Sequence, residues 1–181
     1  MLKASKELAK KIIANSKKSE DVNETNELKK RFNALLKKRS PAYLTASEFD
    51  EIVKWKLDKQ YHRSKEQRSV NTDSVIIPIT QACFAISSDN KDYETELRLK
   101  QLTTIRGIAL PLASAVLAIC FPASYVVIDS VLWESIFGEE KSSFTINDYL
   151  KFIGFIKELS LHTNLPIQDT EHLLWLYIQS L

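Results

Sequence analysis

The sequence predicts an all-α fold of about eight helices, and three observations support this prediction. Apolar residues recur at helical spacing through most of the 181-residue chain, whereas strand-like alternation is almost absent. Glycine occurs only three times. Hydrophobic residues make up 44% and charged residues 27% of the chain, which is ordinary for a globular protein with its own core.

Three helices are predicted in the N-terminal part of the chain, over residues 2–16, 25–39 and 45–57, with a polar linker over 17–26. The second and third carry their apolar residues on one face. The third helix has the clearest start signal, because Thr45 can cap it and Glu48, three residues later, completes a capping box.

The middle of the chain begins with a basic connector over 58–71, which has no apolar pattern. Residues 72–87 are apolar almost all round, which predicts a buried central helix with Pro78 in its first turns or at a kink. An amphipathic, charged helix over 90–105 follows. The next helix, over 111–120, is rich in small residues and starts with a proline, which suits a first turn.

Helices over 130–137, 144–164 and 166–181 are predicted to close the chain. Thr145 is predicted to cap the second of these, and Asp169 or Thr170 the third. The two cysteines, Cys83 and Cys120, lie in apolar helical patterns and are predicted to be buried thiols rather than a disulfide or a metal site. Trp133 and Trp175 are predicted to belong to the core, and no metal or other cofactor is expected.

Charge is distributed unevenly along the chain. Residues 1–68 hold 18 Lys and Arg against 10 Asp and Glu, whereas residues 69–181 hold 7 against 13. The segment 54–68, KWKLDKQYHRSKEQR, has six basic and two acidic residues interleaved with Trp55 and Tyr61. This pattern suits a groove for a nucleic-acid backbone with base stacking. The alternative interpretation is a solvated surface loop whose Lys and Arg stems cover apolar surface, and it stays open.

The nearly uncharged stretch from Thr104 to Trp133 carries the most informative pattern. The segment LTTIRGIALPLAS reads as a helix end, a Gly-centred turn and a Pro-started helix. The first residues of the second helix would present unpaired backbone N–H groups, a potential phosphate site, with Arg106 beside it. Asp129, the single carboxylate of the stretch, opens the helix over 130–137 and, taken alone, is predicted to be only its N-cap.

This stretch resembles the helix–hairpin–helix DNA glycosylase superfamily. That family shows a glycine-containing hairpin, a small-residue helix, a Pro-containing loop and a hydrophobic–Asp pair that opens a further helix. The resemblance covers about 35 residues and implies two small helical subdomains around a hairpin over 102–120. The matching residues, in order, are Leu102, Ile105, Gly107, Ile108, Ala113, Pro122, Ile128 and Asp129.

The resemblance implies roles for particular residues. Asp129 would be the catalytic carboxylate near the mouth of a cleft, where it stabilises an oxocarbenium-like sugar or steers a water onto it. The target base would first leave the stack of double-stranded DNA, the implied partner. A DNA phosphate would bind the hairpin turn formed by Arg106, Gly107, Ile108 and Ala109. The basic segment would contact the duplex through Lys56, Lys59, Arg63, Lys65 and Arg68.

Two departures from the family pattern change these expectations. Ala109 replaces the second hairpin glycine, so the turn is expected to be less able to reach a positive φ or to admit a phosphate. Pro111 stands where members that also cut the backbone carry a lysine, so a monofunctional enzyme is expected. The net acidic charge of residues 69–181 also disfavours duplex binding by that half.

Three functional hypotheses remain open at this point. The first is an intracellular, monofunctional base-excision glycosylase, since neither a membrane span nor a secretion signal is seen. The second is a DNA-binding or protein-interaction module of the same fold without catalysis, and the third is a helical adaptor in which Asp129 only caps. The expected unit covers 1–181, with basic N-terminal helices over 1–40, a helical core over 41–128 and C-terminal helices over 129–181.

Overall fold

The computed structural model describes residues 2–15 and 22–181, and these form helices and loops without a strand. All-α architecture is therefore confirmed, with ten α-helices in these ranges against about eight predicted. Part of the predicted 17–26 linker lies outside the described residues. The helices are α1 (Lys6–Asn15), α2 (Val22–Lys37), α3 (Ala46–Leu57), α4 (Lys65–Arg68), α5 (Asp73–Ala85), α6 (Lys91–Thr103), α7 (Leu110–Cys120), α8 (Ser130–Phe137), α9 (Ile146–Thr163) and α10 (Ile167–Gln179), and a 3-10 turn spans Asp58–Gln60.

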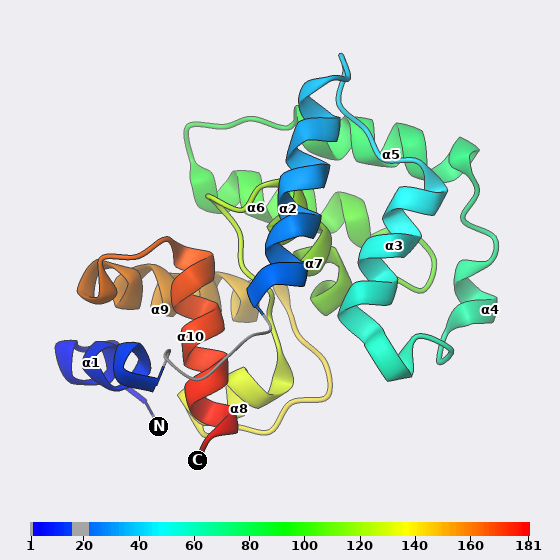
Figure 1. The fold of residues 1–181 in the computed structure, drawn as a ribbon. Helices are drawn as coiled ribbons and strands as arrows, with labels where there is room; N and C mark the ends of the chain where they lie inside the picture. The colour runs from blue at the N-terminus through cyan, green and yellow to red at the C-terminus, as the bar shows by residue number, and fades with distance from the viewer. Residues whose placement is uncertain (1, 16–21) are drawn as a thin grey trace.

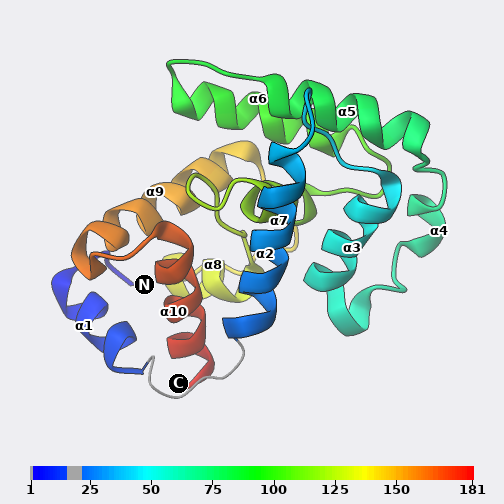
Figure 2. The ribbon, with the colours of Figure 1, turned by 45° about the horizontal axis from the view of Figure 1, so that its top comes forward.

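The helices pack in two groups (Figures 1 and 2). The first group contains α2, α3, α5, α6 and α7, and the second contains α1, α8, α9 and α10. Contact between α6 and α9 joins the two. Helix α1 packs against α9 and α10, whereas α2 packs against α7, so the helices of 1–40 are divided between the groups.

Helix α7 is the most deeply buried element of the fold, since every residue from Leu112 to Cys120 is buried. Its small residues allow α2, α3 and α6 to pack against it closely. The prediction that 72–87 forms the buried central helix is wrong. Helix α5 buries only Ile76, Thr80 and Cys83, and it lies beside α6 at the outer edge of its group (Figure 2).

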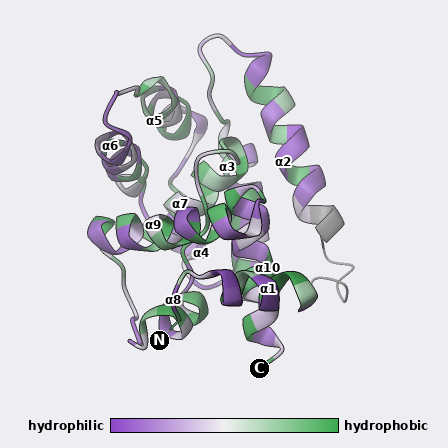
Figure 3. Ribbon diagram, turned by 90° about the vertical axis from the view of Figure 1, so that its left-hand side faces the viewer, coloured by the Kyte–Doolittle hydropathy of each residue, from purple (hydrophilic) through white to green (hydrophobic). Residues whose placement is uncertain are grey.

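Helix α2 packs against α7 from the outside, because it is amphipathic and has one apolar side to bury. Hydrophilic and hydrophobic residues alternate along it (Figure 3), and its buried Phe32 and Leu36 are on the side that faces the core. Cys83 and Cys120 are free and buried, as predicted, and burial raises the pKa of the Cys83 thiol to about 12. None of the described helices is long and apolar enough to cross a membrane.

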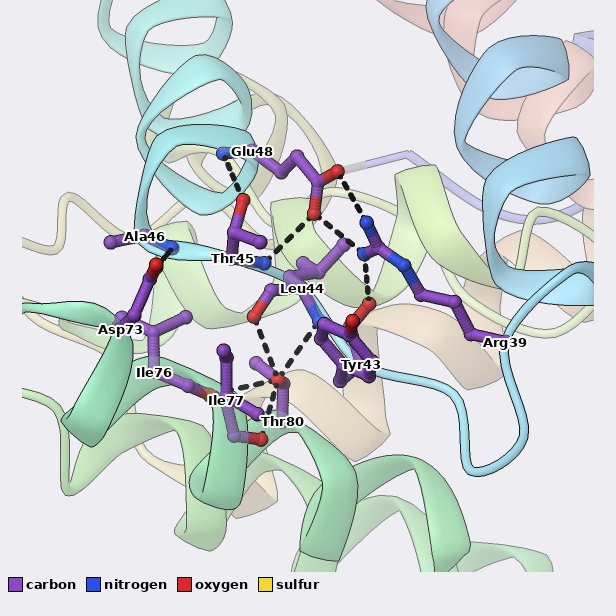
Figure 4. A network of polar contacts seen from close by, with 10 residues as sticks. All are labelled: Arg39, Tyr43, Leu44, Thr45, Ala46, Glu48, Asp73, Ile76, Ile77 and Thr80. Atoms are coloured by element: carbon purple, nitrogen blue, oxygen red, sulfur yellow. Dashed lines mark hydrogen bonds and ion pairs between the residues drawn. The ribbon is translucent and has the colours of Figure 1, made fainter.

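A polar network fixes the start of α3 (Figure 4). Thr45 and Glu48 form the predicted capping box, and Arg39 pairs with the Glu48 carboxylate at 2.7 Å. The Thr80 hydroxyl on α5 accepts a hydrogen bond from the Leu44 N–H at 3.0 Å. The Thr80 contact joins the loop before α3 to α5, and the capping box fixes the first turn of α3.

The last two helices start differently from one another. Thr145 caps α9 in a capping box with Asp148, as predicted. Helix α10 begins at Ile167 directly after Pro166, without a side-chain cap, so the prediction of a cap at Asp169 or Thr170 is wrong. Proline presets a helix-compatible φ, and the Thr170 hydroxyl is instead hydrogen-bonded to that of Thr163 at 2.8 Å.

Candidate active site

Asp129 is positioned by the short connection between α7 and α8. Val126, Val127 and Ile128 are buried in this connection, and the Ile128 N–H donates to the Ser114 hydroxyl on α7 at 3.2 Å. The next residue, Asp129, caps α8 by accepting the Val131 N–H at 2.9 Å on Oδ1. The capping role predicted from the sequence is therefore confirmed.

The second carboxylate oxygen of Asp129 is also engaged. Oδ2 lies 3.1 Å from the Lys56 ammonium, and the two side chains are 27% and 19% exposed. Lys56 belongs to α3 and to the basic segment 54–68, which therefore begins beside Asp129. Because Lys56 pairs with Asp129, it is part of the site rather than a free cation at the surface.

Asp129 and Lys56 line a pocket of about 420 Å³. Its walls come from α2, α3 and α7 of the first group, and from Asp129 and α10 of the second. Figures 1 and 2 show α2 between α3 and α10, and residues of all three helices line the pocket, which thus lies where the two groups meet. Its ionisable residues are Lys29, Lys56, Asp129, Asp169, Glu171 and His172.

Two of these groups have shifted proton affinities. Burial raises the pKa of the Glu171 carboxyl to about 7, and the nearby charge of Asp129 adds to this effect although Lys56 and Lys29 oppose it. Burial lowers the pKa of the Lys29 ammonium, which Glu171 and Asp169 partly offset. The pocket therefore holds a carboxyl that carries a proton near neutral pH beside a carboxylate that is paired with a lysine.

Sequence reasoning did not identify the contribution of α10. Gln168, Glu171, His172 and Trp175 recur at helical spacing and all line the pocket. The prediction that Trp175 is a core residue is wrong, because it is 36% exposed and stacks on the His172 ring at the pocket. Trp133 is buried as predicted. The polar residues at this spacing could have identified this face of α10 in the sequence. They could not have shown that the face lines a pocket with α2 and α3.

The hairpin turn lies between α6 and α7, with Gly107 at φ 77°. Ala109 caps α7 at φ −89°, an ordinary value for alanine, so the expected loss of a positive φ does not arise. The Ile108 N–H donates to the Ile105 carbonyl at 3.1 Å and is thus unavailable to a phosphate. Among the described residues, the N–H groups of Gly107 and Ala109 have no hydrogen-bond acceptor. Arg106 is exposed.

Arg68, which was expected to contact DNA from the basic segment, is buried. It is only 7% exposed, and its guanidinium donates to the Tyr61 carbonyl at 2.8 Å and the Ser64 hydroxyl at 2.6 Å. A Cβ at Gly107 would lie 2.9 Å from the Arg68 Cγ, so Arg68 packs tightly on the hairpin turn. It joins the basic segment to the hairpin turn, and its guanidinium is buried rather than exposed at the surface. The exposed basic residues of the predicted set are Lys59, Arg63 and Lys65.

Comparison of the chain with protein-family models, with curated proteins and with solved structures finds no match. Within residues 2–15 and 22–181, no group of three or more His, Cys, Asp or Glu side chains could hold a metal ion. The pocket thus gathers two lysines, three carboxyl groups and His172.

Proposed function

We propose that this protein is a monofunctional DNA glycosylase that hydrolyses the N-glycosidic bond of a base flipped out of the duplex. One observation carries the proposal: Asp129 lines a pocket, where a helix start and Lys56 hold it in place. Cleavage of a glycosidic bond passes through an oxocarbenium-like sugar, which an adjacent carboxylate stabilises. A pocket is also the space that a flipped base requires.

The surroundings of the pocket are consistent with a DNA backbone running past it. The basic segment starts at the pocket with Lys56 and reaches the hairpin turn with Arg68. Between these two anchors, Lys59, Arg63 and Lys65 are exposed and can meet phosphates. The free N–H groups of the turn, at Gly107 and Ala109, offer one further phosphate contact.

A second function, a DNA-binding module without catalysis, is favoured by a specific observation. Both carboxylate oxygens of Asp129 are occupied, one by the Val131 N–H and the other by Lys56. In the enzyme, Lys56 would have to share this carboxylate with the reacting sugar. In the binding module, the Lys56–Asp129 pair would only link α3 to α8.

Replacement of Asp129 by Asn tests the enzymatic proposal. Asn can still accept the Val131 N–H, so α8 and DNA binding should be retained. The negative charge is lost, and base release should fall by roughly 10²–10³-fold, as for other electrostatic contributions of this type. The measurement is release of free base from duplexes with damaged or mispaired bases, with strands analysed before and after alkali treatment.

Asp148 provides a matched control, because it also bonds to a helix-start N–H and pairs with a lysine, Lys141, but lies outside the pocket. Asp148→Asn should leave base release unchanged. Base release equal to wild type in Asp129→Asn would refute the catalytic role. Duplex binding without base release by the wild type would instead support the binding module. Strand cleavage before alkali treatment would contradict the monofunctional assignment and make Lys56 the first amine to examine.

A further inference from the structure

We infer that Glu171 is the proton donor of this pocket, and that the substrate is a neutral base that leaves only once it is protonated. This inference rests on the proposed function and deepens it. It adds a second catalytic group and a chemical class of substrate to a site that the sequence indicated through Asp129 alone.

The geometry divides the charges of the pocket between the two helix groups. Glu171 on α10 and Asp129 at the start of α8 come from the second group, and these two helices pack against each other. Lys29 on α2 and Lys56 on α3 come from the first. A ligand that enters the pocket therefore meets carboxyl groups from the second group, Asp129, Asp169 and Glu171, and two amines from the first.

The groups that face Glu171 explain why its carboxyl can carry a proton. They are Lys29 from α2, Lys56 from α3, Asp129 from the start of α8, and Asp169 and His172 from α10 itself. Burial is the largest effect and raises the pKa of Glu171 to about 7. The charges of Lys56 and Lys29 lower the pKa and that of Asp129 raises it, and together they leave the effect of burial in place. Glu171 and Asp129 thus differ in role, the first as a proton carrier and the second as a carboxylate paired with Lys56.

The chemistry assigned to the pair balances in protons and electrons. The bond between the sugar C1′ and the base nitrogen breaks, and its electron pair goes to the base. Glu171 gives its proton to the base, which leaves neutral, and Asp129 faces the positive charge that develops on the sugar. Water then adds to C1′ and loses a proton to the ionised Glu171, which restores the starting state. The net reaction consumes one water.

The same arrangement indicates the class of base. A purine alkylated on a ring nitrogen already carries positive charge and leaves without a proton, so it gains nothing from Glu171. A neutral base, in contrast, needs the proton that Glu171 can give. Trp55 and Trp175, which both line the pocket, offer aromatic surface on which its ring can stack.

The test compares Glu171→Gln with wild type on two kinds of duplex, one with a neutral purine such as hypoxanthine or mispaired adenine and one with cationic 7-methylguanine. Single-turnover base release should fall by about 10²–10⁴-fold for the neutral purine, the usual contribution of a general acid. The rate for 7-methylguanine should change by less than threefold. In wild type, release of the neutral base should decline as pH rises through about 7, and this limb should disappear in the variant.

Glu158→Gln is the matched control, because Glu158 is exposed on α9 away from the pocket, and it should behave as wild type. A carbon-13 NMR titration of the Glu171 carboxyl should show a proton that is lost near pH 7, without any substrate. Ionisation below pH 5, or equal loss of both bases in Glu171→Gln, would overturn the inference while the proposed function stands. Wild type that releases only the cationic base would do the same. Release of no base at all would refute the proposed function itself.

Discussion

Asp129 and Asp148 are held by the same two contacts, a backbone N–H at a helix start and a lysine ammonium. The first contact is local, because the aspartate lies within three residues of the N–H that it accepts. The second joins residues far apart for Asp129, since Lys56 lies 73 positions earlier in the chain. The capping contact can therefore be predicted from the local sequence. The contact with Lys56, which also lines the pocket, depends on the tertiary structure.

Glu171 gives a prediction for stability at the residue scale. Its folded pKa of about 7 lies above the ordinary value of 4.5 for a glutamate in an unfolded chain. Between these values the folded state holds a proton that the unfolded state has lost, so this group's contribution to stability falls as pH rises from about 4.5 to 7. Relative to wild type, Glu171→Gln should therefore be more stable at pH 8 than at pH 4.5, by about 3 kcal/mol, because each unit of pKa shift corresponds to about 1.4 kcal/mol.

Urea unfolding at these two pH values measures the effect, and the exposed Glu158→Gln serves as the control. A carboxyl whose pKa is lowered in the folded state changes stability with pH in the opposite direction. Burial raises the pKa of Glu48, but bonds from Arg39 and Thr45 more than offset this and leave the pKa below its usual value. Stability from Glu48 is lost as pH falls, so only the difference between variant and wild type isolates Glu171. An identical gain at both pH values would contradict a shifted carboxyl.

The three glycines form a natural series at the scale of elements. Gly107 in the hairpin turn has φ 77°, and an added Cβ would lie 2.9 Å from Arg68 Cγ. Gly138 at the end of α8 has φ 73° but open space around the Cβ position, and Gly154 in α9 has neither constraint. Together they separate backbone strain from steric contact.

Alanine substitution at each glycine should give three different results. Gly154→Ala should stabilise the protein by about 0.5–1 kcal/mol, because alanine favours helix. Gly138→Ala should cost about 1–2 kcal/mol for the left-handed backbone alone. Gly107→Ala should cost more than Gly138→Ala, because Arg68 must also move. Urea unfolding measures the stability of the three variants. Equal losses at Gly107 and Gly138 would show that the Arg68 side chain moves aside without a cost in stability.

For the molecule as a whole, the distribution of exposed cations predicts how DNA binding depends on salt. Lys59, Arg63 and Lys65 are exposed, whereas Lys56 is paired and Arg68 is buried. Replacing the three exposed residues by alanine should reduce the slope of log K against log salt by roughly 3, about 1 for each DNA phosphate that a cation no longer neutralises. Fluorescence anisotropy with a labelled duplex measures this slope.

The control for this experiment comes from the other helix group. Lys6 and Lys10 on α1 and Lys157 on α9 are equally exposed, and both helices lie on the side away from α4 in Figure 1. Their replacement by alanine removes the same charge from the molecule. If the two triple variants lower the slope equally, net charge rather than the basic segment governs binding, and the proposed path of the DNA is wrong.

The amino-acid sequence alone was sufficient to predict the helical class, most helix starts and the hairpin turn. These follow from interactions within a few residues: the Thr45 and Thr145 capping boxes, the positive φ of Gly107 and the Asp129 cap are each local. The start of α10 was misplaced because Pro166 replaced the expected side-chain cap.

Which helix is central and which charges meet became clear from tertiary packing. The hydropathy of α5 resembles that of a buried helix, but the small side chains of α7 let three neighbours pack closely around it. Likewise, Lys56 and Arg68 look like ordinary surface cations in sequence, and Glu171 looks like an ordinary helix residue. Their roles depend on elements distant in the chain, because burial and charge pairing are set by spatial neighbours that periodicity and spacing do not specify.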